Sequence, residues 1–77
     1  MTKEELLRQL EREERISEFY YLAINDIDRG YPIQDLYNAL KLYLAEEDYE
    51  ACAGIKKAIK EVEHKTLKDI KHGNRFD

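Results

Sequence analysis

Two apolar stripes separated by only three polar residues constrain this chain more than any other feature of its sequence. The first stripe begins at Ile33, and the second runs from Tyr49 to Glu63, each with apolar side chains at steps of three and four. This spacing puts side chains on one side of a helix with 3.6 residues per turn. The connector Glu46–Asp48 is so short that the two helices must fold back on each other. The sequence therefore predicts an antiparallel helical hairpin.

A longer helix is predicted ahead of the hairpin. Thr2 and Glu5 have the spacing of a capping box, in which two side chains bond to free backbone amides at the start of a helix. Gly30 can adopt a left-handed conformation after the last turn, and Pro32 cannot continue a helix but can begin the next one. We therefore expect the first helix to cover residues 3–28.

The predicted helices differ in length, and this difference bears on assembly. The hairpin helices are expected at about residues 32–45 and 48–71, with Asp48 as the N-cap of the second and residues 73–77 as a loose tail. At 1.5 Å per residue the first and last helices measure roughly 39 and 36 Å, but the middle one only about 21 Å. Two long helices cannot both be covered by a short one. The sequence predicts an all-α, three-helix single domain over residues 1–77, in which the ends of the long helices project, fray or bind another molecule, and a homo-oligomer.

The composition is typical of one small helical domain and argues against several classes of protein. A hydrophobic fraction of 43% beside 39% charged residues is the profile of a folded helical chain, not of a disordered one. No run approaches the roughly 20 apolar residues that span a bilayer, so we expect no membrane association. The first residues carry acids where a signal peptide has basic and then apolar residues. With one cysteine, no intramolecular disulfide can form. A cytoplasmic location is expected.

Motifs for catalysis are missing from the sequence. No glycine-rich phosphate loop, Ser–His–Asp set or Cys–His pair can be assembled, so we expect neither enzymatic activity nor a cofactor. Glu61 and His64 have the Glu-x-x-His spacing with which ferritin-like helices hold a metal. Such a site also needs glutamates from other helices, and this stretch is hydrophilic and rich in lysine, so no metal site is predicted. Cys52 lies on the apolar side of the hairpin, which favours packing over a reactive thiol.

The hairpin carries a resemblance to a known family. From Ile33 to Ile59 the chain reads I-x-x-L-x-x-x-L-x-x-x-L-x-E-x-D-Y-E-x-C-A-x-I-K-K-x-I. This order resembles the UVR motif, a module of the excision-repair proteins UvrB and UvrC and of Clp-protease-associated proteins. The resemblance covers residues 33–63, and its most specific part lies between Glu47 and Ile55. Lys56–Lys57 depart from the pattern, since the family commonly has Arg-Asp there.

The resemblance implies a function in protein–protein interaction. UVR hairpins dock with a second helical hairpin in a four-helix arrangement, which here implies another copy or a host protein carrying the same module. A UVR-containing repair protein or a Clp chaperone is the implied partner, and a small acidic protein could act as its regulator. The residues that the resemblance places at or directly under the docking face are Leu40, Tyr43, Leu44, Asp48, Tyr49, Glu50 and Cys52. For Tyr43 and Tyr49, core packing and an interface role are both open.

The last predicted helix suggests an alternative function. The net charge of the chain is −4, but residues 1–54 have a net charge of −7 and residues 55–77 one of +3. Basic residues late in a helix suit its negative dipole end, which is the simpler explanation. They also form one stripe at steps of three and four, so a nucleic-acid-binding helical protein is the alternative. The stripe consists of Lys57, Lys60, His64, Lys68, Lys71 and Arg75.

Overall fold

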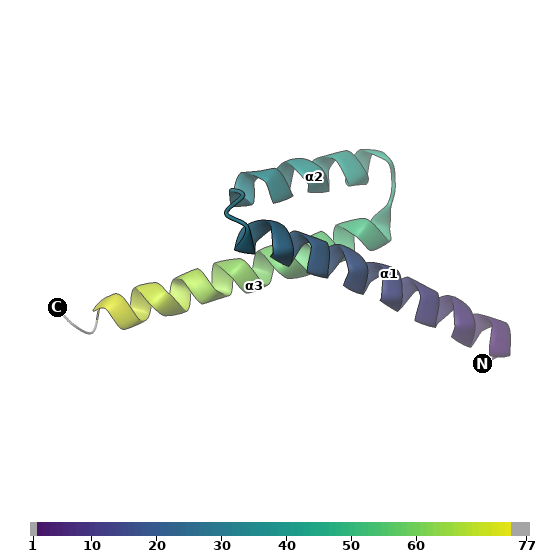
Figure 1. Ribbon diagram of the computed structural model, residues 1–77. Helices are drawn as coiled ribbons and strands as arrows, with labels where there is room; N and C mark the ends of the chain where they lie inside the picture. The colour runs from purple at the N-terminus through teal and green to yellow at the C-terminus, as the bar shows by residue number, and fades with distance from the viewer. Residues whose placement is uncertain (1, 75–77) are drawn as a thin grey trace.

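Three helices make up the structure, a computed structural model that describes the backbone of residues 2–74 and the side chains of residues 2–64. Within these residues there is no strand, and the helices are α1 (Lys3–Asp28), α2 (Ile33–Ala45) and α3 (Tyr49–Asn74) (Figure 1). The predicted all-α, three-helix fold is confirmed, and α1 has the predicted bounds. α3 continues beyond residue 71, so Gly73 and Asn74 belong to the helix and not to a loose tail. Residues 75–77 lie outside the described part of the chain.

Local sequence determines both ends of α1. The Glu5 amide donates to Thr2 Oγ1 at 3.2 Å and the Thr2 amide donates to Glu5 Oε2 at 3.3 Å, which is the predicted capping box. After α1, Gly30 has a φ of +96°, and the Tyr31 amide donates to the Asp26 carbonyl oxygen at 3.0 Å. This bond closes a Schellman motif, in which a residue with positive φ turns the chain out of the helix. The predicted role of Gly30 is therefore confirmed.

α2 ends in the same motif, but without a glycine. The Asp48 amide donates to the Tyr43 carbonyl oxygen at 2.9 Å, and the Glu47 amide donates to the Leu44 carbonyl oxygen at 3.0 Å. Glu47 occupies the position with positive φ, at +60°. The Asp48 carboxylate then accepts a hydrogen bond from the Ala51 amide at 3.4 Å, in the first turn of α3. Asp48 is thus the N-cap of α3, as predicted.

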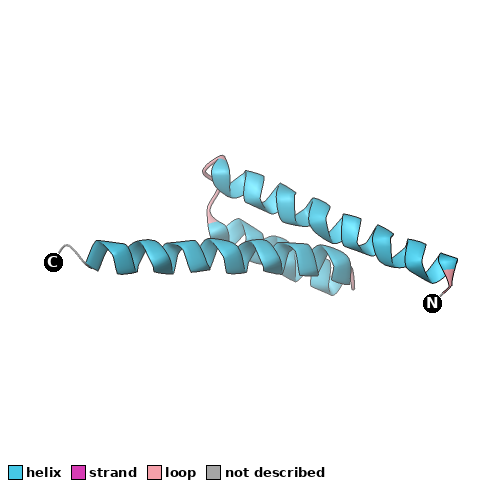
Figure 2. Cartoon of the chain, turned by 90° about the horizontal axis from the view of Figure 1, so that it is seen from below, coloured by secondary structure: helices cyan, strands magenta, loops and turns pink. Residues whose placement is uncertain are grey.

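α3 is the helix on which the other two pack. α1 and α3 run in the same general direction, and α2 runs antiparallel to α3 (Figure 1). α1 makes the more extensive contact with α3 and α2 makes a smaller one, whereas the backbones of α1 and α2 come close at few points. Seen from below, α1 lies to one side of α3 while α2 lies partly behind α3 (Figure 2). The hairpin of α2 and α3 is present, and α1 crosses over its second helix.

Small residues on α3 let α1 approach closely. Ala51 and Ala58 are fully buried, and Gly54 is buried between them at steps of three and four. A Cβ atom on Gly54 would lie 2.4 Å from the Ile16 carbonyl oxygen and 2.7 Å from Phe19 Cβ, both on α1. The backbone of α1 therefore rests directly on Gly54. This explains why a glycine, which destabilises a helix interior by roughly 1 kcal/mol, stands in the middle of α3.

The core lies where the three helices meet, and the long helices extend beyond it. Its buried residues are Ala23, Leu36, Ile55, Ala58 and Ile59. Cys52 is 3% exposed, so its predicted packing role is confirmed. Every residue from 2 to 15 is exposed. The N-terminal end of α1 and the C-terminal end of α3 project on opposite sides of the molecule (Figure 1). The predicted projection of both long helices is therefore confirmed. None of the helices that the described residues form combines the length and apolarity needed to cross a membrane.

Candidate docking surface

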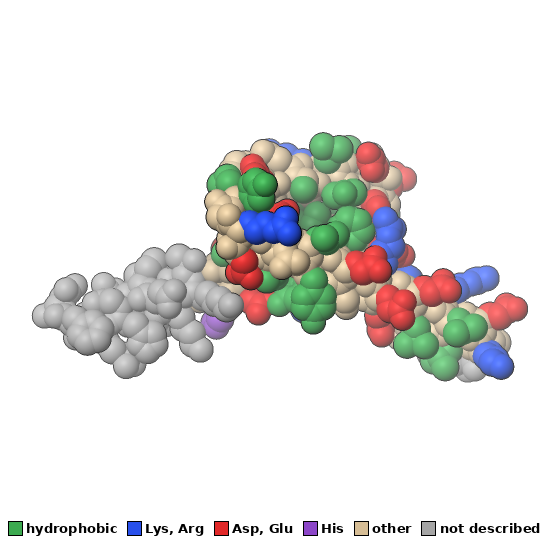
Figure 3. Space-filling model, in the orientation of Figure 1, with side chains coloured by type: hydrophobic (Ala, Val, Ile, Leu, Met, Phe, Trp, Pro, Cys, Tyr) green, Lys and Arg blue, Asp and Glu red, His purple; other side chains and the backbone are tan. Residues whose placement is uncertain are grey.

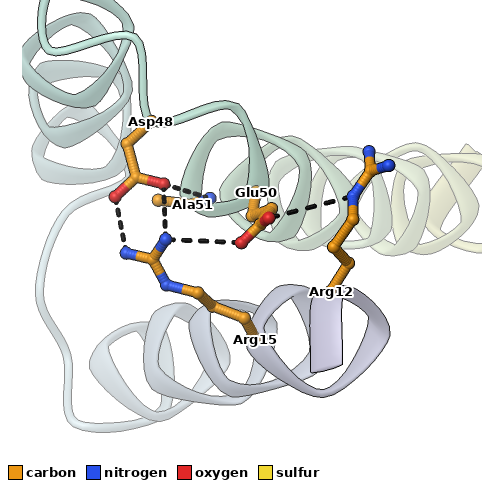
Figure 4. Close-up of polar contacts among 5 residues, drawn as sticks. All are labelled: Arg12, Arg15, Asp48, Glu50 and Ala51. Atoms are coloured by element: carbon orange, nitrogen blue, oxygen red, sulfur yellow. Dashed lines mark hydrogen bonds and ion pairs between the residues drawn. The ribbon is translucent and has the colours of Figure 1, made fainter. Parts of the chain in front are cut away.

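A cluster of ion pairs ties α1 to the corner between α2 and α3 (Figure 4). Arg15 of α1 donates from Nη1 to Asp48 Oδ1 at 3.0 Å and from Nη2 to Asp48 Oδ2 at 2.6 Å. Arg15 Nη1 also donates to Glu50 Oε2 at 3.3 Å, and Arg12 Nε lies 3.8 Å from Glu50 Oε1. The hydrogen bond with Asp48 is the main cause of a raised pKa for Arg15. Paired hydrogen bonds between a guanidinium and a carboxylate also fix orientation, so this cluster sets where α1 crosses the hairpin.

Intramolecular partners therefore occupy two of the predicted docking residues. The Asp48 side chain both caps α3 and binds Arg15, and its exposed fraction is 19%. Glu50 binds Arg15 and Arg12 and has an exposed fraction of 28%. A partner that bound either carboxylate directly would have to displace a cation that is already present. Docking at Asp48 and Glu50 stays a prediction, and it would require that displacement.

The other predicted docking residues lie in three different environments. Cys52 is buried, and Leu40 and Tyr43 are half-buried against the core. The Tyr43 ring meets the Phe19 ring edge-on, with centroids 5.2 Å apart. Leu44 and Tyr49 are exposed, at 52% and 65%.

Tyr43 therefore packs against the core, whereas Tyr49 does not. An interface role stays a prediction for both. Tyr49 is the first residue of α3 and stands at the corner, ahead of the part of α3 that α1 crosses. The spacing of apolar residues in the sequence does not show whether a tyrosine at this position is buried or exposed. The exposure of Tyr49 follows from where the neighbouring helices lie.

An apolar groove lies between α1 and α2. Both helices pack on α3, and although the Phe19 and Tyr43 rings meet, the two backbones come close at few points, so a cleft remains between them. Figure 3 shows hydrophobic side chains gathered over both helices on this face of the molecule. Leu22 is 59% exposed although it lines this groove. The lining residues are Phe19, Leu22, Ala23 and Asp26 of α1, Leu36, Ala39 and Tyr43 of α2, and Ile55 of α3.

Comparison of the chain with protein-family models, with curated proteins and with solved structures finds no match. The resemblance of residues 33–63 to the UVR motif therefore stays a prediction. A functional proposal for this chain therefore starts from the geometry of the groove.

Most of the groove residues were not predicted from the sequence, and Tyr43 alone belongs to both sets. The predicted face was confined to the hairpin, whereas one wall of the groove comes from α1. A signal for that wall exists in the run Phe19–Ile24, in which six consecutive residues are apolar. A helix that is apolar all round at one level needs cover on more than one side. α3 covers one side of this run, and Leu22 faces the groove on another.

The predicted basic stripe lies only partly within the described side chains. Lys57, Lys60 and His64 are exposed. Lys57 Nζ lies 4.8 Å from the centre of the Tyr20 ring, so this lysine covers an aromatic face of the same molecule. The remaining members, Lys68, Lys71 and Arg75, lie outside the described side chains.

Two tyrosine hydroxyls bind carboxylates of α3 beside this stripe. Tyr20 of α1 donates to Glu61, and Tyr37 of α2 donates to Glu63. These hydrogen bonds, followed by partial burial, raise the pKa of both tyrosines. Glu61 of the Glu-x-x-His spacing is thus engaged by Tyr20. Among side chains 2–64, no three His, Cys, Asp or Glu residues are grouped to hold a metal.

Proposed function

We propose that this chain is a non-catalytic protein–protein interaction module that receives a helix of a partner protein in the groove between α1 and α2. The observation that supports this is the arrangement of the helices: α1 and α2 both pack on α3 and leave apolar side chains between them. A fourth helix in the groove would complete a four-helix arrangement. Removal of Leu22 and its neighbours from water supplies the driving force.

The length of α2 and the charge at Asp26 indicate what kind of helix the groove accepts. α2, which forms one wall, has 13 residues, or about 20 Å at 1.5 Å per residue. A helix of similar length with apolar residues at steps of three and four would lie along it, as in other helix-in-groove complexes. Asp26 is the one charged residue among those that line the groove. A lysine or arginine at the matching end of the partner helix would therefore favour binding.

The UVR resemblance suggests where such a helix comes from. We propose a helical hairpin of a UVR-containing repair protein or of a Clp chaperone as the partner, with this chain as a small regulator of that protein. Tyr43 connects the two lines of reasoning, because it belongs both to the resemblance and to the groove. Leu44 and Tyr49 are exposed and remain candidates for contacts at the edge of the same interface.

A pair of neighbouring substitutions tests the groove. Leu22 and Tyr21 are both exposed, at 59% and 64%, but only Leu22 lines the groove. Leu22→Glu should abolish retention of the partner in affinity capture from the native cell, and Tyr21→Glu should leave it intact. Both variants should keep the helical circular dichroism of the wild type, since neither side chain is buried. If every captured protein is retained equally by the two variants, the groove is not the binding site.

Salt dependence separates this proposal from the nucleic-acid alternative. Binding in an apolar groove should respond little to salt, whereas binding to phosphates weakens steeply, with a slope of about 0.9 in log affinity per phosphate contact. The triple variant Lys60→Gln, Lys68→Gln, Lys71→Gln should bind the protein partner as the wild type does. We expect no duplex binding at physiological salt. Duplex binding that disappears in this variant would favour the nucleic-acid function instead.

A further inference from the structure

The N-terminal part of α1, residues 3–14, carries a second apolar surface that is separate from the groove. We call residues 3–14 the leucine arm. Leu6, Leu7 and Leu10 are 50%, 52% and 49% exposed, and every residue from 2 to 15 is exposed. The arm projects beyond the body of the molecule (Figure 1), and hydrophobic side chains gather on it in Figure 3.

The leucines lie on a different side of α1 from the side that meets α3. Leu10 and Phe19 are nine residues apart, which is two and a half helical turns, so they project from opposite sides. Phe19 packs against the core, whereas the arm leucines are absent from it. If α1 packed on α3 further toward its N-terminus, Leu6, Leu7 and Leu10 would still be uncovered. Another molecule must do so if they are to leave water.

Charges mark the two ends of this apolar face. Lys3 precedes Leu10 by seven residues, or about two turns, and therefore lies on the same side of the helix. Glu13 and Glu14 follow Leu10 by three and four residues and lie on that side as well. The face is thus basic at its start, apolar in its middle and acidic at its end.

We infer that the leucine arm binds the leucine arm of a second copy of the chain in an antiparallel pair. In this arrangement Lys3 of each copy lies opposite Glu13 and Glu14 of the other. Leu6 and Leu7 of each copy lie opposite Leu10 of the other, and the three leucines of both arms leave water together. A parallel pair would instead place lysine against lysine and glutamate against glutamate. An antiparallel pair has twofold symmetry and closes on itself, so the product is a dimer.

The dimer leaves both grooves open, so this inference does not depend on the proposed function. Two grooves on one dimer could engage two sites of a partner at once, which increases binding through effective concentration. The arm is also short for a helix whose tertiary contact is the Arg12–Glu50 ion pair near its end, since isolated helices of about 12–15 residues are marginal in water. Pairing should therefore order the arm. The helical circular dichroism signal should rise with protein concentration as dimers form.

Sedimentation equilibrium over a concentration series tests the inference. The wild type should approach twice its 9.2 kDa mass as concentration rises. The double variant Leu6→Glu, Leu10→Glu should remain a monomer and lose the concentration dependence of its helical signal. Its core should be intact, because neither side chain packs against the core cluster. Leu42→Glu is the matched control, since Leu42 is 62% exposed but lies on α2, and it should dimerise like the wild type.

Charge reversal tests the antiparallel register. Lys3→Glu alone and the pair Glu13→Lys, Glu14→Lys should each weaken the dimer, and the three changes together should restore it. Lys3→Glu does not act by weakening the helix, because an acid in the first turn is favourable there. A wild type that is monomeric up to its solubility limit would overturn the inference. A dimer that persists in the variant Leu6→Glu, Leu10→Glu would also overturn it, as would a dimer that is lost in Leu22→Glu. The same holds if the variant with all three charge reversals does not recover dimerisation.

Discussion

Arg15 on α1 and Asp48 at the start of α3 are joined by two parallel hydrogen bonds, with N–O distances of 3.0 and 2.6 Å. Asp48 also bonds to both helices that meet at this corner. Its amide donates to the Tyr43 carbonyl oxygen at the end of α2, and its carboxylate accepts from the Ala51 amide in α3. One residue therefore ends α2, begins α3 and holds α1. The corner is where the relative placement of the three helices is decided.

Removal of the Arg15 guanidinium should destabilise the fold more than removal of Arg12. Arg12 has one partner at 3.8 Å and a side chain that is 70% exposed, whereas Arg15 binds two carboxylates. Thermal unfolding of Arg15→Gln should show the lower melting temperature of the two variants. Arg15→Lys should recover only part of the loss, because an ammonium cannot make the paired bond. Equal melting temperatures for Arg15→Gln and Arg12→Gln would contradict the role assigned to this pair.

Gly54→Ala should push α1 away from α3. The added Cβ would meet the Ile16 carbonyl oxygen at 2.4 Å, and a backbone atom cannot rotate aside. Overpacking typically costs about 1–3 kcal/mol, and a Gly-to-Ala change in a helix returns about 1 kcal/mol. Because the clash involves backbone, we expect a net loss of about 2 kcal/mol in the free energy of unfolding by denaturant.

Ala53→Gly is the matched control for this substitution. Ala53 is the preceding residue of α3 and is only partly buried. This change should reveal the local difference in helix propensity alone, about 1 kcal/mol. If Gly54→Ala proves more stable than the wild type by that amount, α1 does not rest on Gly54.

Glu47→Gly should stabilise the protein. Glu47 is exposed and has a φ of +60°, in the left-handed region that costs a residue with a Cβ atom roughly 1–2 kcal/mol. Glycine is free of that cost but loses about 0.4–1 kcal/mol through its more flexible unfolded chain. The net gain should be about 0.5–1 kcal/mol by chemical denaturation. Glu47→Ala is the control, because it removes the charge but keeps a Cβ atom in the left-handed conformation. It should therefore not show this gain in stability.

Tyr43→Ala and Tyr49→Ala should differ sharply in stability. Tyr43 is half-buried and packs edge-on against Phe19, so its truncation should cost roughly 2–3 kcal/mol, somewhat less than the loss at a fully buried aromatic. Tyr49 is 65% exposed, and its truncation should change stability by no more than about 0.5 kcal/mol. Denaturation of the two variants side by side measures this. A large loss for Tyr49→Ala would mean that the corner packs differently.

Tyr20 and Tyr37 should make stability fall at alkaline pH. Their hydrogen bonds to Glu61 and Glu63 raise the pKa of each hydroxyl in the folded protein above its ordinary value of about 10. A raised pKa means that the stabilisation is fully present below pH 10 and is lost as pH rises through the folded-state pKa. Ultraviolet titration should show two of the six tyrosines ionising late. The double variant Tyr20→Phe, Tyr37→Phe should abolish this late phase, and its persistence would exclude these two residues as the cause.

Helix existence and most helix ends could be predicted from the sequence alone. The capping box of Thr2 and Glu5, the left-handed Gly30 and the N-cap Asp48 all involve residues within about five positions of each other. Such bonds are determined by local geometry, so a short window of sequence contains the information for them. The same holds for the apolar periodicity of α2 and α3. Gly73 was the exception, because a glycine near a helix end favours termination but does not enforce it.

The placement of the site was decided only by the tertiary structure. The short connector required α2 to fold back on α3, but nothing local required α1 to cross α3 at Gly54. That crossing depends on the missing Cβ atom of Gly54 facing backbone atoms of Ile16 and Tyr20, far earlier in the chain. It leaves the groove open between α1 and α2 and leaves Tyr49 in water, whereas Cys52 is buried on the α2 side, next to the Leu40 carbonyl oxygen. The exposure of Leu22, Tyr43 and Tyr49 depends on where the neighbouring helices lie, and the spacing of residues within one helix does not contain that information.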